Sequence, residues 1–200
     1  MTAAPVRRGR PGYSLDSLLD VAVALFNERG YDATSMEELA ARLGITKSAI
    51  YHHVPSKVEL LRLALDRALD ALFAVTEEPG ATGGAAIDRL EHVVRGSVRV
   101  LAAELPFVTL LLRVRGNSPV EQAALQRRRR FDRVVTDLVR AAEEEGDVRP
   151  DVDPAITSRL LFGTVNSLVE WYRPSGPVDA ARLADAVAAI AFEGLEATPR

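Results

Sequence analysis

The sequence contains no cysteine, three histidines, one tryptophan, and no apolar run long enough to cross a membrane. Without cysteine the protein can hold no disulfide, thiolate metal site or thiol nucleophile, which fits a reducing cytoplasm. Three histidines argue against a zinc centre, and a bilayer span needs roughly 18–20 apolar residues. The basic start of the chain lacks the apolar core of a signal peptide. We therefore expect a cytoplasmic protein with no metal and no membrane segment.

Groups suited to catalysis are also scarce. The chain has no glycine-rich phosphate loop after a strand, and His92 is the only histidine beyond residue 62. A histidine in a context such as EHVVRGS is usually solvent-facing or lightly packed. An enzyme is therefore the weaker alternative, and we expect no catalytic residue and no cofactor.

The charge is divided unevenly along the chain. Residues 1–62 carry eight Lys/Arg and seven Asp/Glu, whereas residues 63–200 carry 17 and 21. A mildly positive N-terminal part on an acidic body is compatible with DNA contact by one end only. A composition that is 48% hydrophobic and 26% charged is ordinary for a globular protein and argues against disorder.

Helical periodicity runs through nearly the whole chain, and glycine and proline mark the joints. No strand-like alternation is present. The sequence therefore predicts an all-α fold of eight or nine helices. The expected helices are Ser14–Arg29, Met36–Arg42, Lys47–His53, Ser56 to about Thr76, and about 85–104, 106–115, 119–145, 153–173 and 178–195.

Two features mark the boundaries of these helices. Thr34 with Glu37, and Ser56 with Glu59, match the capping-box pattern that opens a helix. Residues 78–84, EPGATGG, are typical of a linker.

The segment TSMEELAARLGITKSAIYHHVPSKVELL, residues 34–61, has the helix-turn-helix pattern. Two short helices flank a turn centred on Gly44, which supplies the backbone freedom that the turn needs. An outward face on the second helix suits hydrogen bonds to base edges and phosphates, because a major groove admits one α-helix. The small core of the motif comprises Leu39, Ala40, Leu43, Ile45 and Ile50, and the outward face comprises Lys47, Ser48, Tyr51 and His52.

Residues 14–65 resemble the DNA-binding domain of the TetR family of bacterial repressors. The positions that agree are Phe26, Gly30, Thr34, Ile45, Tyr51, His53, Ser56, Lys57 and Leu60. Val54 departs from the pattern, since an aromatic residue is commoner there, and this should affect packing more than DNA contact. The resemblance implies that the helix after the turn reads the major groove, and that Tyr51 and Lys57 contact phosphate.

The resemblance also implies a two-domain organisation, with residues 1–62 binding palindromic operator DNA and residues 63–200 binding an effector and forming a homodimer. A three-helix N-terminal domain would be joined to the C-terminal helical domain by a long helix, and effector binding would cause derepression. We expect the DNA-binding residues to be Arg7, Arg8, Arg10, Thr34, Ser35, Thr46, Lys47, Ser48, Tyr51, His52 and Lys57.

Several of these assignments have structural alternatives. Lys47 could be a solvated surface lysine, and Tyr51 could be a core residue. Adjacent helical residues point about 100° apart, so at most one of His52 and His53 should face the groove, and we favour His52. The basic arm around Arg8 could be a disordered tail, although arginine arms also enter the narrow minor groove.

The C-terminal half carries a four-arginine run, residues 127–130, that spans a full helical turn. The run could form salt bridges with Glu121, Asp132, Asp137 or neighbouring helices, or it could bind an anionic effector, because the guanidinium geometry matches phosphate and carboxylate. The residue pattern does not decide which of the four arginines face a pocket.

The helix around Trp171 could likewise be core, dimer interface or ligand site. Together with the arginine-bearing helix it loosely resembles TetR-type regulators of fatty-acid, phenylacetate and steroid-acid catabolism, which implies an acyl-CoA effector. The expected effector-binding residues are Phe107, Leu111, Arg113, Arg127, Arg130, Phe131, Phe162, Asn166 and Trp171.

The last two expected helices carry small and apolar residues suited to a four-helix bundle between two protomers. A DNA-architectural or protein-binding module without a ligand is the other alternative, but the long helical half exceeds what dimerisation requires. The expected dimer-interface residues are Leu160, Thr164, Leu183, Val187, Ile190 and Leu195.

Overall fold

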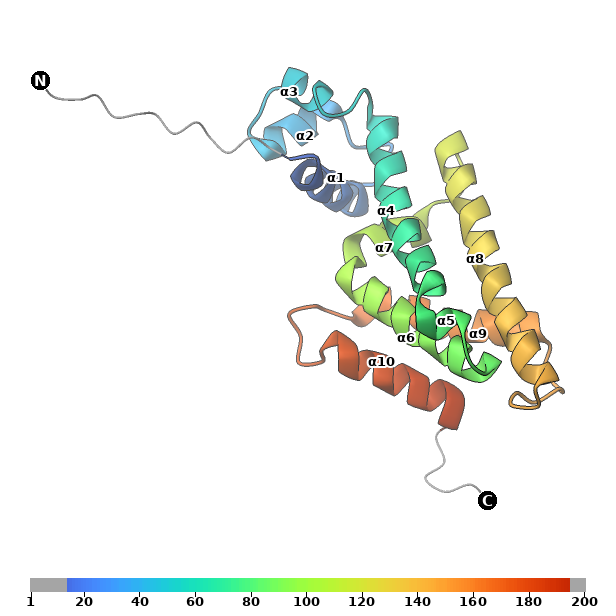
Figure 1. Cartoon of the computed structure of the whole chain (residues 1–200). Helices are drawn as coiled ribbons and strands as arrows, with labels where there is room; N and C mark the ends of the chain where they lie inside the picture. Colours follow the sequence, from blue (N-terminus) through green and yellow to red (C-terminus); the bar gives the residue numbers. More distant parts are fainter. Residues whose placement is uncertain (1–13, 195–200) are drawn as a thin grey trace, which may run out of the picture. The chain divides into compact units, whose positions relative to one another are not determined.

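A computed structural model describes residues 14–194, and these are entirely helical or loop, which confirms the predicted all-α fold. None of the helices in this range is both long and apolar enough to cross a membrane. Figure 1 shows the helices in chain order. They are α1 (Leu15–Arg29), α2 (Met36–Leu43), α3 (Lys47–Tyr51), α4 (Lys57–Glu77), α5 (Pro79–Thr82), α6 (Ala86–Ala103), α7 (Leu105–Arg113), α8 (Pro119–Glu144), α9 (Pro154–Trp171) and α10 (Ala180–Ala188), followed by a π-helical turn, Ala189–Glu193.

The chain divides into two compact units, residues 1–61 and 62–200. In the first unit α1 packs on α2, and α2 packs on α3. Ser14 caps α1 by accepting a hydrogen bond from the Ser17 amide. The packing buries one face of each helix, with a core made of Leu18, Leu19, Ala22, Val23, Leu25, Phe26, Met36, Leu39, Ala40, Leu43, Ile50, Val54, Leu60 and Leu61.

The capping box of α2 lies one residue later than the sequence predicts. Ser35 is the N-cap, and its hydroxyl accepts from the Glu38 amide at 3.1 Å while the Glu38 carboxylate accepts from the Ser35 amide at 2.9 Å. The predicted pair of Thr34 and Glu37 is wrong, because the run TSMEE offers two overlapping matches. Burial decides between them, since Thr34 is turned into the core.

In the second unit α6 is the central helix, and α5, α7, α8, α9 and α10 all pack against it. The α8 and α9 helices also pack on each other. Aromatic rings fill the space between them: Phe131 lies edge-on to Phe162 at 5.3 Å and to Phe73 at 5.7 Å. The core cluster here comprises Ala81, Leu90, Val93, Phe131, Val135, Leu138 and Val139.

The segment expected to be a linker is instead a short, packed helix. α5 begins at Pro79 and lies on α6, with Ala81 in the core. The Arg89 side chain donates to the Ala81 carbonyl at 3.0 Å, and Glu78 bonds His92 at 2.6 Å. The linker prediction is wrong because the sequence signal came from proline and glycine, whereas the side chains around this turn fix it to α6.

The long helix α4 contains no glycine or proline and continues from the first unit into the second. Its close approach to α6 depends on Gly96, where an added Cβ would lie 2.3 Å from a Val75 methyl.

Candidate functional site

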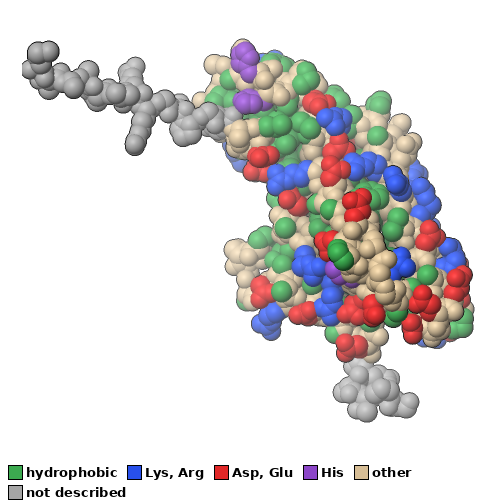
Figure 2. All heavy atoms as spheres, in the orientation of Figure 1, with side chains coloured by type: hydrophobic (Ala, Val, Ile, Leu, Met, Phe, Trp, Pro, Cys, Tyr) green, Lys and Arg blue, Asp and Glu red, His purple; other side chains and the backbone are tan. Residues whose placement is uncertain are grey.

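The exposed residues of α3 form the face that the sequence predicts for DNA. Lys47, Ser48, Tyr51 and His52 are all exposed, and Tyr51 is 45% exposed. The Lys47 ammonium lies 5.9 Å from the Tyr51 ring centroid, so these two side chains share one face of the helix. Histidine side chains stand at the surface of this unit in Figure 2. The second histidine, His53, is exposed as well.

The turn before α3 is held by backbone hydrogen bonds. Gly44 adopts a left-handed conformation (φ +66°), which glycine adopts without a side-chain penalty. The Gly44 amide donates to the Ala41 carbonyl, and the Ile45 amide donates to the Ala40 carbonyl at 3.0 Å. Ile50 is fully buried behind the exposed face. The orientation of α3 is therefore fixed by the core of this unit.

The structure gives Lys57 an internal role. Its ammonium donates to the carbonyls of Tyr31 at 2.9 Å, Thr34 at 2.8 Å and Asp32 at 3.4 Å, and lies 4.4 Å from the Tyr31 ring centroid. An ammonium has three donors, and all three are accounted for. Lys57 therefore fastens the start of α4 to the α1–α2 loop, and a phosphate would have to displace these bonds.

Three hydroxyl residues expected at the DNA surface also serve the fold. Thr34 is buried and donates to the Gly30 carbonyl at 2.9 Å. Ser35 caps α2, and Thr46 caps α3 by accepting from the Ala49 amide at 3.2 Å. Thr46 remains exposed and Ser35 partly so. The expected arm residues, Arg7, Arg8 and Arg10, lie outside the described residues.

Residues 14–61 contain four basic side chains and seven acidic ones. Every one of the four basic side chains is engaged within the unit: Arg29 pairs with Glu38, Arg42 with Glu28, Lys47 with Glu37, and Lys57 with the three carbonyls. The Lys47 pair lowers the pKa of the Glu37 carboxyl. A DNA acceptor at Lys47 would have to replace the Glu37 carboxylate.

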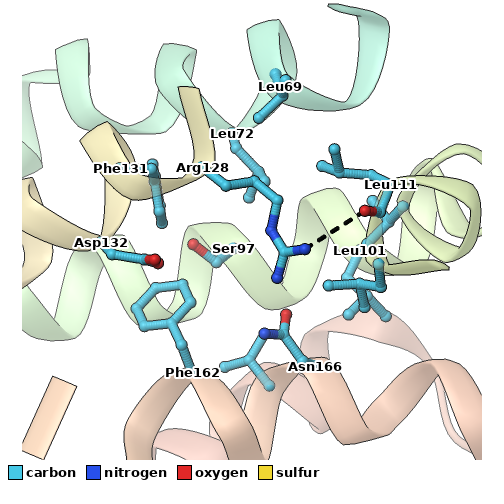
Figure 3. A pocket seen from close by; sticks show the side chains of 13 residues that line it. Leu69, Leu72, Ser97, Leu101, Leu111, Arg128, Phe131, Asp132, Phe162 and Asn166 are labelled. Atoms are coloured by element: carbon cyan, nitrogen blue, oxygen red, sulfur yellow. Dashed lines mark hydrogen bonds between the residues drawn. The ribbon is translucent and has the colours of Figure 1, made fainter. Parts of the chain in front are cut away.

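The second unit contains a narrow cavity of about 40 Å³ enclosed by α4, α6, α7, α8 and α9 (Figure 3). Most of its lining is apolar. Four polar side chains also line it, Ser97, Arg128, Asp132 and Asn166. The apolar lining residues are Leu69, Leu72, Leu101, Val108, Leu111, Leu112, Phe131, Phe162 and Val165.

Arg128 reaches from α8 toward the middle of this cavity, where Asn166 of α9 faces it, and the Ser97 hydroxyl of α6 points toward the side of Asp132 (Figure 3). The Arg128 guanidinium donates to the Leu111 carbonyl at 3.5 Å. Burial raises the pKa of the neighbouring Asp132 carboxyl, although Arg128 and two further arginines act to lower it. The cavity thus combines an apolar lining with groups that can hydrogen-bond a ligand.

The neighbouring arginines of the run point elsewhere. Arg127 bridges two carboxylates of α4, with 2.7 Å to Asp66 and a second ion pair to Asp70. Arg130 lies 5.6 Å from the Phe73 ring centroid in an outer groove between α4 and α8. Salt bridging to a neighbouring helix, one of the expected alternatives, is therefore present at Arg127. Glu121, Asp132 and Asp137 form no ion pair with the run among residues 14–194.

Glu121 holds the loop before α8 instead. Its carboxylate accepts from the amides of Arg115, Gly116 and Asn117 at 2.8–3.1 Å. Burial raises the pKa of Glu121, but the three amide bonds outweigh it and leave the pKa below its usual value.

The cavity therefore brings together four of the residues expected to bind the effector: Leu111, Phe131, Phe162 and Asn166. Phe107 is buried beneath the Arg67 guanidinium at 4.1 Å, and neither Arg113 nor Trp171 lines the cavity. Sequence reasoning missed Ser97 and Asp132, and it named Arg127 and Arg130 of the arginine run rather than Arg128, which lines the cavity. The interruption of an apolar α6 face by a serine was the available signal for Ser97.

An exposed apolar stripe runs along α9 and onto the π-helical turn. Leu160 is 66% exposed, Trp171 56% and Ile190 53%. A groove of about 470 Å³ includes Leu160, Thr164 and Ile190 in its lining. Leu183 and Val187, also expected at the dimer interface, are buried within the protomer where α10 packs on α6. The last expected interface residue, Leu195, lies outside the described range.

Comparison with known proteins assigns both halves of the chain. Residues 18–64 match the family described as bacterial regulatory proteins, tetR family, and residues 83–195 match the tetracyclin repressor-like C-terminal domain. The chain is 30% identical to the transcriptional repressor KstR2 of Rhodococcus jostii over 89% of each chain.

Solved structures agree with this assignment. SCO3833, a TetR-family member from Streptomyces coelicolor A3, is 53% identical with a TM-score of 0.85, covering 98% of this chain and 95% of that one. AibR, solved with isovaleryl coenzyme A and operator DNA, shares the fold at 23% identity and a TM-score of 0.76, over 88% and 97% of the two chains.

Proposed function

This chain belongs to the TetR family of bacterial transcriptional regulators and is a DNA-binding repressor of that type, and we propose that an acyl-CoA thioester releases it from its operator. The observation that carries the proposal is the cavity in the second unit, because Leu69 and Leu72 of α4 form part of its lining. The same helix begins in the first unit at Lys57, whose ammonium bonds the carbonyls of the α1–α2 loop.

On the DNA side, we assign the contacts to the exposed face of α3. Lys47 and Tyr51 would bind phosphate or base edges, with Ser48, His52 and the exposed Thr46 beside them. Because residues 14–61 carry more acidic than basic side chains, attraction to the phosphate backbone must come largely from the arm that contains Arg7, Arg8 and Arg10. We expect these arginines to enter the minor groove.

We further assign the exposed stripe of Leu160, Thr164, Trp171 and Ile190 to a two-fold dimer interface. Apolar side chains that are more than half exposed on one face call for a partner, and a second copy of the same stripe gives an isologous four-helix bundle. Two recognition helices would then enter successive major grooves, roughly 34–36 Å apart, and the operator would be palindromic.

The narrow cavity supports a mechanism for release. A volume of about 40 Å³ holds a few water molecules, whereas ligand sites usually measure about 300–1,000 Å³. An acyl group can therefore enter only if the surrounding helices move apart, and α4 is one of them. A ligand that binds the widened arrangement a hundredfold better supplies about 2.7 kcal/mol of coupling against the DNA-bound form.

The acyl-CoA assignment is supported by the chemistry of the cavity and by AibR, whose structure holds isovaleryl coenzyme A together with operator DNA. Leucine and phenylalanine side chains suit an acyl chain, and Arg128 supplies a cation in the same cavity. Arg127 is less suited to coenzyme A phosphates than its position in the run suggests, since two carboxylates already neutralise it.

Operator release tests the proposal. Fluorescein-labelled DNA flanking the encoding gene is titrated with the protein, and the complex is then challenged with acyl-CoA esters, the matching free acids, or coenzyme A alone. We expect specific binding to a palindrome and release by the esters only. Release by the free acids at the same concentration would point to a lipophilic effector without coenzyme A, and binding that no ester reverses would contradict the proposal.

A further inference from the structure

Two polar side chains in the effector cavity lack the partners that equivalent side chains find elsewhere in this protein. Ser97 is 1% exposed and lies on α6, and its hydroxyl has no hydrogen-bond partner among residues 14–194. Hydroxyls on other helices bond to the carbonyl one turn earlier, as Thr109 does to Leu105 at 2.7 Å and Thr136 does to Asp132 at 2.8 Å. The hydroxyl of Ser97 is instead turned into the cavity (Figure 3).

Arg128 shows the same contrast with other arginines of the unit. Arg67 binds Glu104 through two nitrogens at 2.7 and 3.1 Å, and Arg127 binds two carboxylates. Arg128 is half-buried, and its one hydrogen bond within the described part of the chain is the long contact to the Leu111 carbonyl. The other N–H donors of its guanidinium, which has five in all, therefore have no protein acceptor within residues 14–194.

From this pair we infer that the buried end of the effector carries an acceptor oxygen, a ketone or a carboxylate, which Arg128 and Ser97 bind together. The inference rests on the proposed function and narrows it from acyl-CoA esters in general to esters with an oxygenated acyl chain. A plain hydrocarbon chain would cover a guanidinium and a hydroxyl without satisfying either, which is unfavourable. The Asn166 side chain faces the same space with its amide oxygen toward Arg128 (Figure 3), and its NH₂ group is a further donor.

The surroundings define the ligand further. Asp132 lines the same cavity and partly offsets the positive charge of Arg128. A neutral ketone oxygen and a carboxylate are therefore both compatible with the site, provided that the oxygen reaches the guanidinium. The remaining lining is leucine, valine and phenylalanine, which suits the carbon chain between that oxygen and the thioester.

A set of esters matched at six acyl carbons tests the inference: hexanoyl-CoA, 5-oxohexanoyl-CoA and adipoyl-CoA. Release of labelled operator from the full-length protein is titrated with each. We expect at least one oxygenated ester to act at about tenfold lower concentration than hexanoyl-CoA, because a buried polar site discriminates against a ligand that leaves it unpaired. Equal or stronger action of hexanoyl-CoA would overturn the inference while leaving the proposed function standing.

Variants identify the groups responsible. Arg128→Met keeps the side-chain stem and should abolish the advantage of the oxygenated ester, and Ser97→Ala should reduce it. Arg129→Met is the matched control, since Arg129 is exposed on the same helix, and it should leave the advantage unchanged. An advantage that survives in both Arg128→Met and Ser97→Ala would overturn the assignment.

If no ester releases the operator, the proposed function fails and the inference with it. Thermal stability without any ligand separately tests the observation behind the inference, the unpaired Ser97 hydroxyl. A buried hydroxyl that lacks a partner destabilises the ligand-free protein, so Ser97→Ala should raise the melting temperature by about 2–4 °C. Thr109→Val removes a hydroxyl that is hydrogen-bonded and should lower it. A fall in melting temperature for Ser97→Ala would show that the hydroxyl serves the fold.

Discussion

The polar side chains of the two candidate sites differ in how far they are hydrogen-bonded within the protein. In the N-terminal unit the hydroxyls of Ser35 and Thr46 cap helices, and Lys57 holds three carbonyls. In the C-terminal unit Ser97 and Arg128 are left facing a cavity. A surface that reads DNA benefits from being rigid before contact, whereas a sensor must hold groups that only its ligand satisfies.

The largest expected effect is loss of dimerisation through the exposed apolar stripe of the second unit. Leu160→Asp places a charge in the proposed dimer interface twice, once from each protomer, and should raise the dimer dissociation constant at least about 100-fold. Analytical ultracentrifugation at low concentration measures this. Gln126→Asp, at an exposed position on α8, is the control and should remain dimeric. A dimeric Leu160→Asp protein would place the interface elsewhere.

The internal role of Lys57 predicts a loss of stability rather than of DNA contact. Lys57→Met removes three charge-assisted hydrogen bonds and should lower the free energy of unfolding by about 2–3 kcal/mol. Chemical denaturation measures it. The slope of log operator affinity against log salt should stay unchanged, whereas Lys47→Met should reduce that slope by about one unit. A reduced slope in Lys57→Met would show that this lysine contacts the phosphate backbone.

The close contact of α4 with α6 predicts a somewhat smaller effect. Gly96→Ala would put a methyl group against the buried Val75 side chain and should cost about 1–3 kcal/mol of stability through overpacking. Because α4 forms part of the cavity wall, the same variant should also change the effector concentration needed for operator release. Adding Val75→Ala should recover much of the lost stability, and failure of this double variant to do so would disprove the contact.

The smallest expected effect concerns Glu121, a carboxylate of the second unit whose hydrogen bonds are all made within the protein. It tests whether polar side chains away from the cavity stabilise this unit as they do the first. The pKa of Glu121 is lowered in the folded protein, so its stabilising contribution is complete above the unfolded pKa, near 4.5. The contribution is lost as the pH falls through the folded value. Glu121→Gln should therefore lower the melting temperature at pH 7 by a few degrees and flatten its decline below pH 4.5. An unchanged acid profile would contradict this.

Most helices could be predicted from the sequence because their ends depend on local chemistry. The predicted bounds of α1, α4 and α6 differ from the observed ones by a residue or two. Helix ends cannot be predicted from the sequence where two neighbouring residues could both cap the helix and tertiary packing selects one of them. Thr34 and Ser35 match the capping pattern equally well, and only burial of Thr34 selects Ser35.

The arginine run shows the same limit at the candidate site. Arg127 and Arg128 are chemically identical neighbours that point about 100° apart on α8. Which of them enters the cavity depends on the rotation of α8 about its axis. That rotation is set partly by Asp66 and Asp70 on α4, some 60 residues away in the sequence, and no pattern within α8 records it.

The absence of glycine and proline from α4 has a mechanical consequence. From Leu69, at the cavity, to Lys57 the helix rises 1.5 Å per residue, which makes a stiff arm about 18 Å long. A tilt of about 5° around Leu69 would therefore carry the Lys57 end sideways by about 1.6 Å. In a two-fold dimer the displacements add to about 3 Å, close to one base-pair step of DNA. If the proposed function is correct, a tilt of this size would put the two reading helices out of register with the grooves.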